Sequence, residues 1–339
     1  MKTAVITKEK IVDINLLFWI IILLVSIWGA NWGADKLATP LNKLRQQWGV
    51  TEAAGAAFVA LATASPEIGT NTASAIQGLS DIGLGNLLGS NIVSVPAIVT
   101  VAYIAGQKYS KNQPNNFVEP LKVKSEALTV QTIPYLLVIG LAALLTIPKP
   151  WRGLQPIDGW LMLGTYFIYL TQAIIRKQQK GTKAKWKIQE IIIAISGIFS
   201  LILCAYLIIT STEKIVSILG IDRLVGGLFI TSTVSIVPEV FATWNVAKSG
   251  QFTTAITSVI ADNTATMTLG FFPLALATLP VEDIKLYSVN LFFVALLGIV
   301  YSLCLHFGKQ KYSFSLTKVL AINGIYLIYL IVVIFVFLR

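Results

Sequence analysis

Charged and catalytic residue types are scarce in this sequence. Only 12% of its 339 residues are charged, about half of what a soluble domain usually contains. Cysteine occurs twice, at Cys204 and Cys304, both inside apolar runs, which argues against a disulfide framework or a cysteine metal site. The single histidine, His306, leaves little material for a Ser-His-Asp catalytic group. We therefore expect a protein that is not an enzyme and carries no cofactor.

Long apolar stretches are abundant instead. Runs of about 20 apolar residues recur, each long enough to cross a hydrocarbon core of roughly 30 Å, and in lipid such runs must be helical because unpaired backbone groups are costly there. The sequence predicts an all-α integral membrane protein with ten transmembrane helices near residues 14–36, 50–76, 82–106, 127–147, 156–175, 189–212, 224–247, 253–279, 286–306 and 317–338. A basic start precedes the first run, as in a signal peptide, but the length of the run favours a membrane helix.

The net charge of +10 is unevenly divided between the predicted loops. Most Lys and Arg residues lie on the side opposite the termini, including a cluster between Arg176 and Lys187. The positive-inside rule places this connector, residues 176–188, in the cytoplasm and both termini outside, most simply in a bacterial plasma membrane. Topology therefore explains the cluster without nucleic acid. The expected partners are inorganic cations and the lipid bilayer, with no obligate protein partner.

The chain contains an internal repeat. Val237-Pro238-Glu239 repeats Ser65-Pro66-Glu67 at an offset of 172 residues (67 to 239). The same offset relates Gly55 to Gly227, Thr63 to Ser235, Gly78 to Gly250 and Asn91 to Asn263. The repeat unit is five helices, residues 1–175 and 189–339, and because five is odd the second unit must enter the membrane from the opposite side. Inverted repeats of this kind are typical of secondary transporters.

Three acidic residues lie inside predicted helices: Glu67, Glu239 and Asp262. A charge at the bilayer centre costs at least about 2.5–3.5 kcal/mol, so such residues usually mark a functional site. None has a Lys or Arg in the middle of its own helix, and a bound cation is the natural partner. The alternative is a protonated carboxyl that forms a structural hydrogen bond between helices.

Proline precedes each glutamate, and proline interrupts a helix by removing a backbone donor. We therefore expect both helices to be broken there, with freed carbonyls available to an ion. Hydroxyl and amide side chains surround these positions: Thr63, Ser65, Asn71, Asn86, Ser90, Asn91, Ser94, Ser232, Ser235, Thr243, Thr257, Ser258, Asn263, Thr264 and Thr266. Oxygen ligands suit calcium or sodium rather than zinc or copper.

These motifs resemble those of the sodium/calcium exchangers of the calcium/cation antiporter superfamily. The first repeat matches over Ala62-Thr63-Ala64-Ser65-Pro66-Glu67 and Gly85-Asn86-Leu87-Leu88-Gly89-Ser90-Asn91, whereas the second keeps only Pro238-Glu239 and Asn263. The resemblance implies two inverted five-helix repeats, with Glu67 and Glu239 as shared calcium and sodium ligands. It further implies that Thr63, Ser235 and Ser90 are ligands.

The sequence departs from the family pattern at several positions. The hydroxyl that the family has three residues before each glutamate is replaced by Ala64 and Ile236. The amide or carboxylate expected 27 residues after each glutamate is replaced by Ser94 and Thr266, while Asp262 stands one turn before Thr266. We therefore add Asp262, Ser94, Thr266, Asn91 and Asn263 to the candidate cation ligands.

The favoured function is a secondary-active antiporter that exchanges Ca²⁺ for Na⁺ by alternating access. A proton-coupled antiporter of the same fold is the alternative, because carboxylates also carry protons. An ion channel is a third interpretation, which the inverted repeat disfavours.

Overall fold

The computed structural model describes residues 2–48, 60–111, 121–123, 131–150, 152–176, 186–307 and 312–337. Within these ranges the chain is helical apart from connections and four two-residue strands. The elements of the first half are α1 (Lys2–Gln47), α3 (Ser65–Ile76), α4 (Ser80–Lys111), β1 (Leu121–Lys122), α5 (Ile133–Thr146), β2 (Gly153–Leu154) and α6 (Pro156–Arg176). Those of the second half are α7 (Ile188–Leu219), α8 (Arg223–Gly226), η2 (Gly227–Thr231), α9 (Ser232–Ser235), α10 (Val237–Lys248), α11 (Phe252–Ala265), η3 (Thr266–Gly270), α12 (Phe271–Leu276), β3 (Leu279–Pro280), α13 (Ile284–His306), β4 (Ser313–Phe314), α14 (Leu316–Val332) and η4 (Val333–Phe337).

Seven stretches of the described chain are long and apolar enough to cross a membrane. They are Ile14–Leu37, Ser80–Lys108, Ile188–Leu219, Arg223–Lys248, Phe252–Leu276, Ile284–His306 and Leu316–Phe337, and the shorter apolar helix Ile133–Thr146 accompanies them. Each corresponds to a predicted transmembrane helix. Residues 50–59, 127–130 and most of the connector 176–188 lie outside the described residues. The all-helical, multi-pass membrane architecture is thus confirmed, and the number ten stays a prediction.

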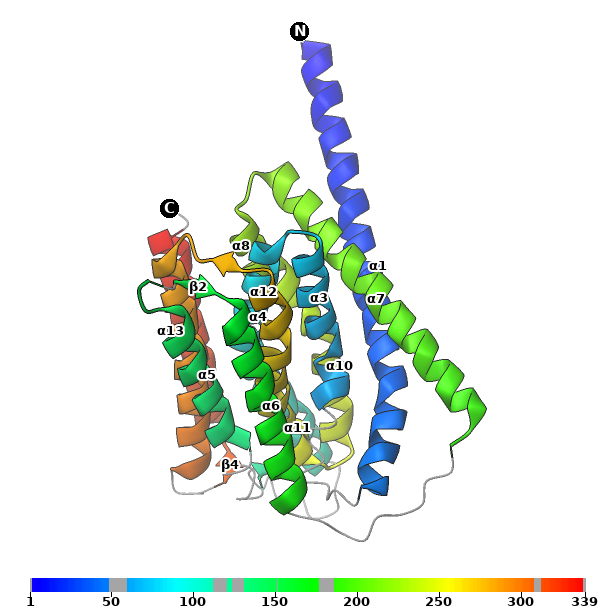
Figure 1. Ribbon diagram of the computed structural model, residues 1–339, viewed down its shortest axis with the longest axis vertical. Helices are drawn as coiled ribbons and strands as arrows, with labels where there is room; N and C mark the ends of the chain where they lie inside the picture. Colours follow the sequence, from blue (N-terminus) through cyan, green and yellow to red (C-terminus); the bar gives the residue numbers. More distant parts are fainter. Residues whose placement is uncertain are drawn as a thin grey trace.

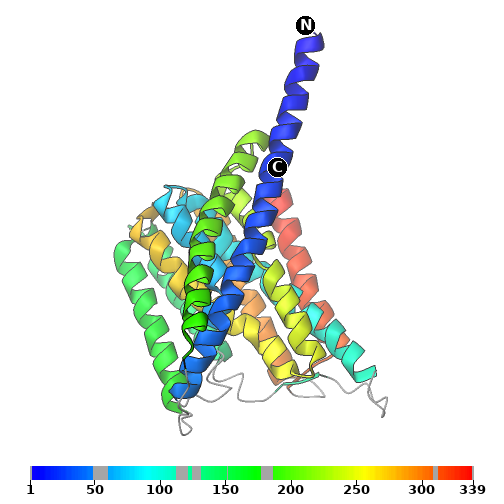
Figure 2. The same cartoon turned by 90° about the vertical axis from the view of Figure 1, so that its right-hand side faces the viewer.

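Helices α1 and α7 lie side by side at the edge of the bundle (Figures 1 and 2). They cross at small residues: a Cβ added at Gly33 would lie 2.6 Å from the carbonyl oxygen of Gly197. An ion pair between Lys43 and Glu190 joins the end of α1 to the start of α7. Most of their large apolar side chains are exposed, as expected of helices that face lipid.

The centre of the bundle is formed by α4 and α11, whose side chains are mostly buried. Backbones approach closely where α4 meets η2. A Cβ added at Gly85 would lie 2.2 Å from the carbonyl oxygen of Leu224 and 2.8 Å from Cα of Gly227. Glycine is therefore required at this crossing, where it permits close helix packing.

Two short antiparallel pairs of strands mark the two ends of the bundle. β2 pairs with β3, so the α5–α6 and α12–α13 connections lie together at the upper end in Figure 1. β1 pairs with β4, which brings the chain before α5 beside the chain before α14 at the lower end. Consequently α5 and α13 run in opposite directions, as do α6 and α14.

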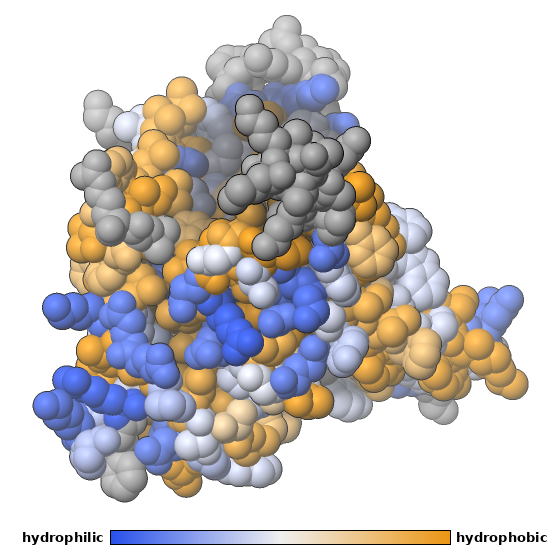
Figure 3. Space-filling view, turned by 90° about the horizontal axis from the view of Figure 1, so that it is seen from above, coloured by the Kyte–Doolittle hydropathy of each residue, from blue (hydrophilic) through white to orange (hydrophobic). Residues whose placement is uncertain are grey.

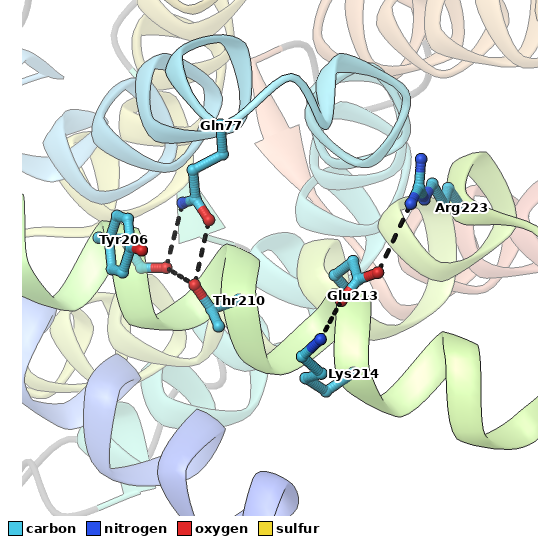
Figure 4. A network of polar contacts seen from close by, with 6 residues as sticks. All are labelled: Gln77, Tyr206, Thr210, Glu213, Lys214 and Arg223. Atoms are coloured by element: carbon cyan, nitrogen blue, oxygen red, sulfur yellow. Dashed lines mark hydrogen bonds and ion pairs between the residues drawn. The ribbon is translucent and has the colours of Figure 1, made fainter.

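Polar contacts tie the upper end of α7 to its neighbours (Figure 4). Gln77, just beyond α3, donates to the carbonyl oxygen of Tyr206 at 3.3 Å and accepts from Thr210 at 3.1 Å. Glu213 pairs with Arg223 at the start of α8 at 3.5 Å. Viewed from this end, hydrophilic side chains gather over the middle of the face and hydrophobic ones flank them (Figure 3).

We expect Gly85→Ala to lower stability, because the added methyl group meets backbone atoms that cannot rotate away. Overpacking of this kind typically costs about 1–3 kcal/mol. Thermal unfolding in detergent measures the effect. The matched control is Gly324→Ala on α14, where a Cβ would meet nothing within 4 Å and helix propensity favours alanine. Equal unfolding temperatures for the two variants would contradict the crossing described here.

Candidate cation site

Two helices are interrupted at equivalent positions. Residues 60–63 are helical, Ala64 is a turn, and α3 begins at Ser65. In the second half α9 ends at Ser235, Ile236 is a turn, and α10 begins at Val237. Each break directly precedes the segment that contains Pro66 or Pro238, whose missing N–H groups cannot continue the helical ladder. The predicted breaks are confirmed.

The breaks bring three carboxylates together. Glu67 lies in the first turn of α3, Glu239 in the first turn of α10, and Asp262 near the end of α11. Each offers an oxygen that lies within 4.8 Å of the others. Their residues are 1%, 7% and 3% exposed. The predicted approach of Glu67 and Glu239 is therefore confirmed, and Asp262 faces them rather than lipid.

No basic side chain of the described residues pairs with this cluster. The ion pairs found elsewhere among the described residues join Lys43 to Glu190, and Glu213 to Lys214 and Arg223. Two like charges about 4 to 5 Å apart repel by about 4 kcal/mol at an effective dielectric constant of about 20. Three carboxylates at this separation therefore need either a cation between them or protons.

Hydrogen bonds leave part of the cluster unsatisfied. Both carboxylate oxygens of Glu67 and Oδ1 of Asp262 are buried without a hydrogen-bond partner among the described residues. Unsatisfied buried acceptors are costly, and a carboxylate accepts but does not donate. Position in the first turn of a helix gives Glu67 and Glu239 partial compensation, because the positive end of the helix dipole favours negative charge.

The other predicted ligands lie at different places around the carboxylates. The side chain of Thr63 lies within hydrogen-bond reach of Asp262. The single hydroxyl hydrogen of Ser235 faces two acceptors, the carbonyl oxygen of Thr231 at 2.7 Å and Oδ1 of Asn86 at 3.2 Å. Ser90 donates to its own helix. Oγ1 of Thr266 is buried without a hydrogen-bond partner among the described residues. Whether these oxygens hold a cation stays a prediction.

Asn91, Asn263 and Ser94 contact one another. Ser94 donates to Oδ1 of Asn263 at 3.0 Å, and Nδ2 of Asn263 lies 3.4 Å from the carbonyl oxygen of Asn91. Oδ1 of Asn91 accepts from Tyr135 at 3.3 Å. These contacts hold α4 against α11, although an amide oxygen has a second lone pair for a ligand.

Two features of the site were not predicted from the sequence. Tyr166 and Tyr169 of α6 pack beside the small residues Ala64 and Ala261, so aromatic rings cover one side of the broken helix. In addition, Asn71 and Asn86 hydrogen-bond each other at 2.9 Å. The amides were visible as polar residues in apolar helices, but their pairing carries no sequence signal.

The donor set is made of oxygen alone. Among the described residues the cluster supplies three carboxylates with hydroxyls and amides around it, and neither imidazole nor thiolate belongs to it. Calcium takes six to eight oxygen ligands at about 2.3–2.6 Å in flexible geometry. The cluster therefore fits a hard cation, with a divalent ion offsetting most of its charge.

A family model and curated relatives match most of the chain. The model of the family described as sodium/calcium exchanger protein matches residues 18–175 and 190–336. A curated relative, the putative antiporter CaxA of Alkalimonas amylolytica, is 23% identical over 265 residues, 73% of this chain and 76% of the relative.

Solved structures share the fold. The H⁺/Ca²⁺ exchanger CAX superposes with a TM-score of 0.71 at 13% identity, over 95% of this chain and 82% of that one. The sodium-calcium exchanger NCX_Mj superposes with a TM-score of 0.61 at 20% identity, over 93% and 98%.

We expect Glu67→Gln and Glu239→Gln each to abolish stabilisation by calcium, because the amide keeps the shape of the side chain but removes the charge that offsets the ion. A ligand at a hundred times its Kd stabilises by about 2.7 kcal/mol, which thermal unfolding with and without Ca²⁺ detects. Glu213→Gln at the end of α7 is the matched control and should retain the response. If calcium still stabilises either site variant fully, the glutamate replaced in that variant is not a calcium ligand.

Proposed function

The chain belongs to the sodium/calcium exchanger protein family, and on this basis we propose that it is a secondary-active antiporter that exchanges Ca²⁺ for Na⁺ by alternating access. The family is a transporter family of inorganic cations, not an enzyme family. The observation that carries the proposal is the cluster of Glu67, Glu239 and Asp262, buried within 4.8 Å of one another in a membrane-spanning bundle. Ca²⁺ and Na⁺ are then transported substrates, and no cofactor takes part.

The cluster has features that a carrier needs. Glu67 and Glu239 come from the two halves of the chain, so a cation held between them contacts both halves at once. Thr63 and Ser235 lie four residues before the glutamates, in the segments that end at the breaks. The ends of broken helices offer oxygen ligands to cations in transporters. These residues, with Ser90, Asn91, Ser94, Asn263 and Thr266 around them, are our proposed ligand set.

We propose that the architecture is ten helices in two inverted repeats, residues 1–175 and 189–339, joined by the connector 176–188. Three pairs of corresponding helices support it. α1 descends and α7 rises in Figure 1, and the strand pairs require opposite directions for α5 and α13 and for α6 and α14. The equivalent breaks at Ala64 and Ile236 support it further.

The orientation in the membrane is also a proposal. The start of α1 and the end of η4 lie at the same, upper end of the bundle, whereas the end of α6 and the start of α7, between which the connector runs in the sequence, lie at the lower end (Figure 1). The positive-inside rule favours a cytoplasmic connector and outside termini. The bilayer would be the plasma membrane of a bacterium.

Proton coupling is the second candidate, and the third carboxylate favours it. One divalent ion offsets two of the three charges in the cluster, so one carboxylate remains for a proton. Ala64 and Ile236 also replace hydroxyls that the resemblance would assign to sodium.

We expect calcium to accumulate in sealed vesicles that contain the purified protein when a sodium gradient is imposed, because the outward flow of sodium drives calcium inward. ⁴⁵Ca²⁺ uptake with a sodium gradient at fixed pH, and with a pH gradient in sodium-free buffer, separates the two candidates. Uptake with the pH gradient alone would identify protons, not sodium, as the coupling ion. No uptake under either gradient, in protein that calcium stabilises, would contradict antiport of calcium.

We expect Asp262→Asn to weaken calcium uptake without eliminating it, because two glutamates remain to offset the ion. If Asp262 carries a proton instead, the substitution changes the pH profile of exchange more than the calcium dependence. A structural role predicts intact transport with lower thermal stability. Uptake, pH profile and unfolding temperature of this one variant distinguish the three roles, and intact uptake with an unchanged pH profile would contradict a place for Asp262 in the site.

A further inference from the structure

A chain of buried amides and hydroxyls connects four elements beside the carboxylates. Asn71 of α3 donates to the carbonyl oxygen of Gly270 in η3 at 3.4 Å. Asn86 of α4 donates to Oδ1 of Asn71 at 2.9 Å, and Ser235 of α9 donates to Oδ1 of Asn86 at 3.2 Å. The two amides are fully buried and Ser235 is 5% exposed. We refer to Asn71, Asn86 and Ser235 as the amide bridge.

The amide bridge lies between the carboxylates and the upper end of the bundle. Asn71 follows Glu67 by four residues on a rising helix, and Ser235 precedes Glu239 by four residues on a descending one (Figure 1). Four residues of helix span about 6 Å. The bridge therefore lies about one turn above the carboxylates, and an ion that entered from the upper side between these four elements would meet it first.

The opposite side of the site has no corresponding amides. The 172-residue offset relates Asn71 to Thr243 and Asn86 to Ser258, both of which lie below the carboxylates because their helices run in the opposite direction. Ser258 donates to the carbonyl oxygen of Ala255 in its own helix at 3.1 Å. A hydroxyl is shorter than an amide and has one donor instead of two, and the hydrogen bond that Ser258 donates stays within its own helix.

We propose that the amide bridge is the gate on the side of the termini, and that its asymmetry biases the carrier toward the state that is closed on that side. This inference rests on the proposed alternating access. In an inverted repeat with identical halves, the two access states would be related by the repeat symmetry and nearly equal in free energy. Amides on one side and hydroxyls on the other remove that balance, because a hydrogen-bonded bridge forms in only one of the two states.

The second repeat supplies the side chains for a test. Asn71→Thr with Asn86→Ser gives the upper side the residues that the lower side has, and Thr243→Asn with Ser258→Asn does the converse. The substitution Ser90→Cys, four residues beyond Asn86 on α4, places a thiol on the carboxylate side of the bridge, where its labelling reports access. Cys204 and Cys304 are first replaced by alanine, and a membrane-impermeant thiol reagent is added from each side in turn.

We expect slow labelling from the termini side in the Ser90→Cys background. Labelling should become at least about tenfold faster once Asn71→Thr/Asn86→Ser is added, because the three hydrogen bonds of the amide bridge are lost. Thr243→Asn/Ser258→Asn should slow labelling from the other side. The control is Asn290→Ser on α13, away from the site. It removes a buried amide that accepts a hydrogen bond from Tyr329 at 2.8 Å, and it should leave both labelling rates unchanged. Size-exclusion chromatography and thermal unfolding identify folded variants.

An unchanged labelling rate in folded Asn71→Thr/Asn86→Ser overturns the gate. An equally large increase of the labelling rate in Asn290→Ser also overturns it, because the increase would then come from a general loosening of helix packing. If the first pair does not fold, an unchanged rate in Thr243→Asn/Ser258→Asn overturns it instead. Labelling needs no calcium, so the two proposals fail separately. If the unsubstituted chain transports calcium but the labelling rate does not change when the amide bridge is substituted, only the gate is contradicted. If the labelling rate does change but the unsubstituted chain transports no calcium, only the proposed function is contradicted.

Discussion

The mutual repulsion of three carboxylates in a water-poor interior is the constraint on which the rest of the structure depends. Glu67, Glu239 and Asp262 approach within 4.8 Å although the described residues give them no basic partner. Charges in a membrane interior are costly to keep, and a fold of marginal stability retains them only with compensation. A cation that enters and leaves provides that compensation and gives the cluster a function.

The helices are built around this constraint. Breaks at Ala64 and Ile236 place each glutamate in the first turn of a new helix, where the helix dipole favours its charge. Gly85 and Gly227 let α4 and η2 approach to backbone contact, which brings the polar face of α4 beside the site. Outside this centre most large apolar side chains of α1 and α7 face outward. Apolar side chains fill most of the space between the central helices, and a few hydrogen-bonded amides link these helices.

Much of the site could be predicted from the sequence because its determinants are local. Pro66-Glu67 and Pro238-Glu239 predict a broken helix and a carboxylate at once, and their repetition predicts that the two meet. Asp262 was predicted as the third carboxylate because an acid in an apolar helix needs a partner. The pairing of Asn86 with Asn71, and of Ser94 with Asn263, could not be predicted, because it depends on the rotation of packed helices about their axes. The cover of Tyr166 over the broken helix depends on how α6 docks, which no short motif encodes.

The most direct test of a cation between the three carboxylates is a crystal structure with Ca²⁺ or Sr²⁺ and its anomalous difference map. We predict one strong peak between Glu67, Glu239 and Asp262, with carboxylate oxygens at about 2.3–2.6 Å from a calcium ion. A peak that persists there in Glu213→Gln and disappears in Glu239→Gln would agree with the account. A map with no peak at the cluster, from crystals in which a divalent ion occupies another site in the membrane interior, would contradict it.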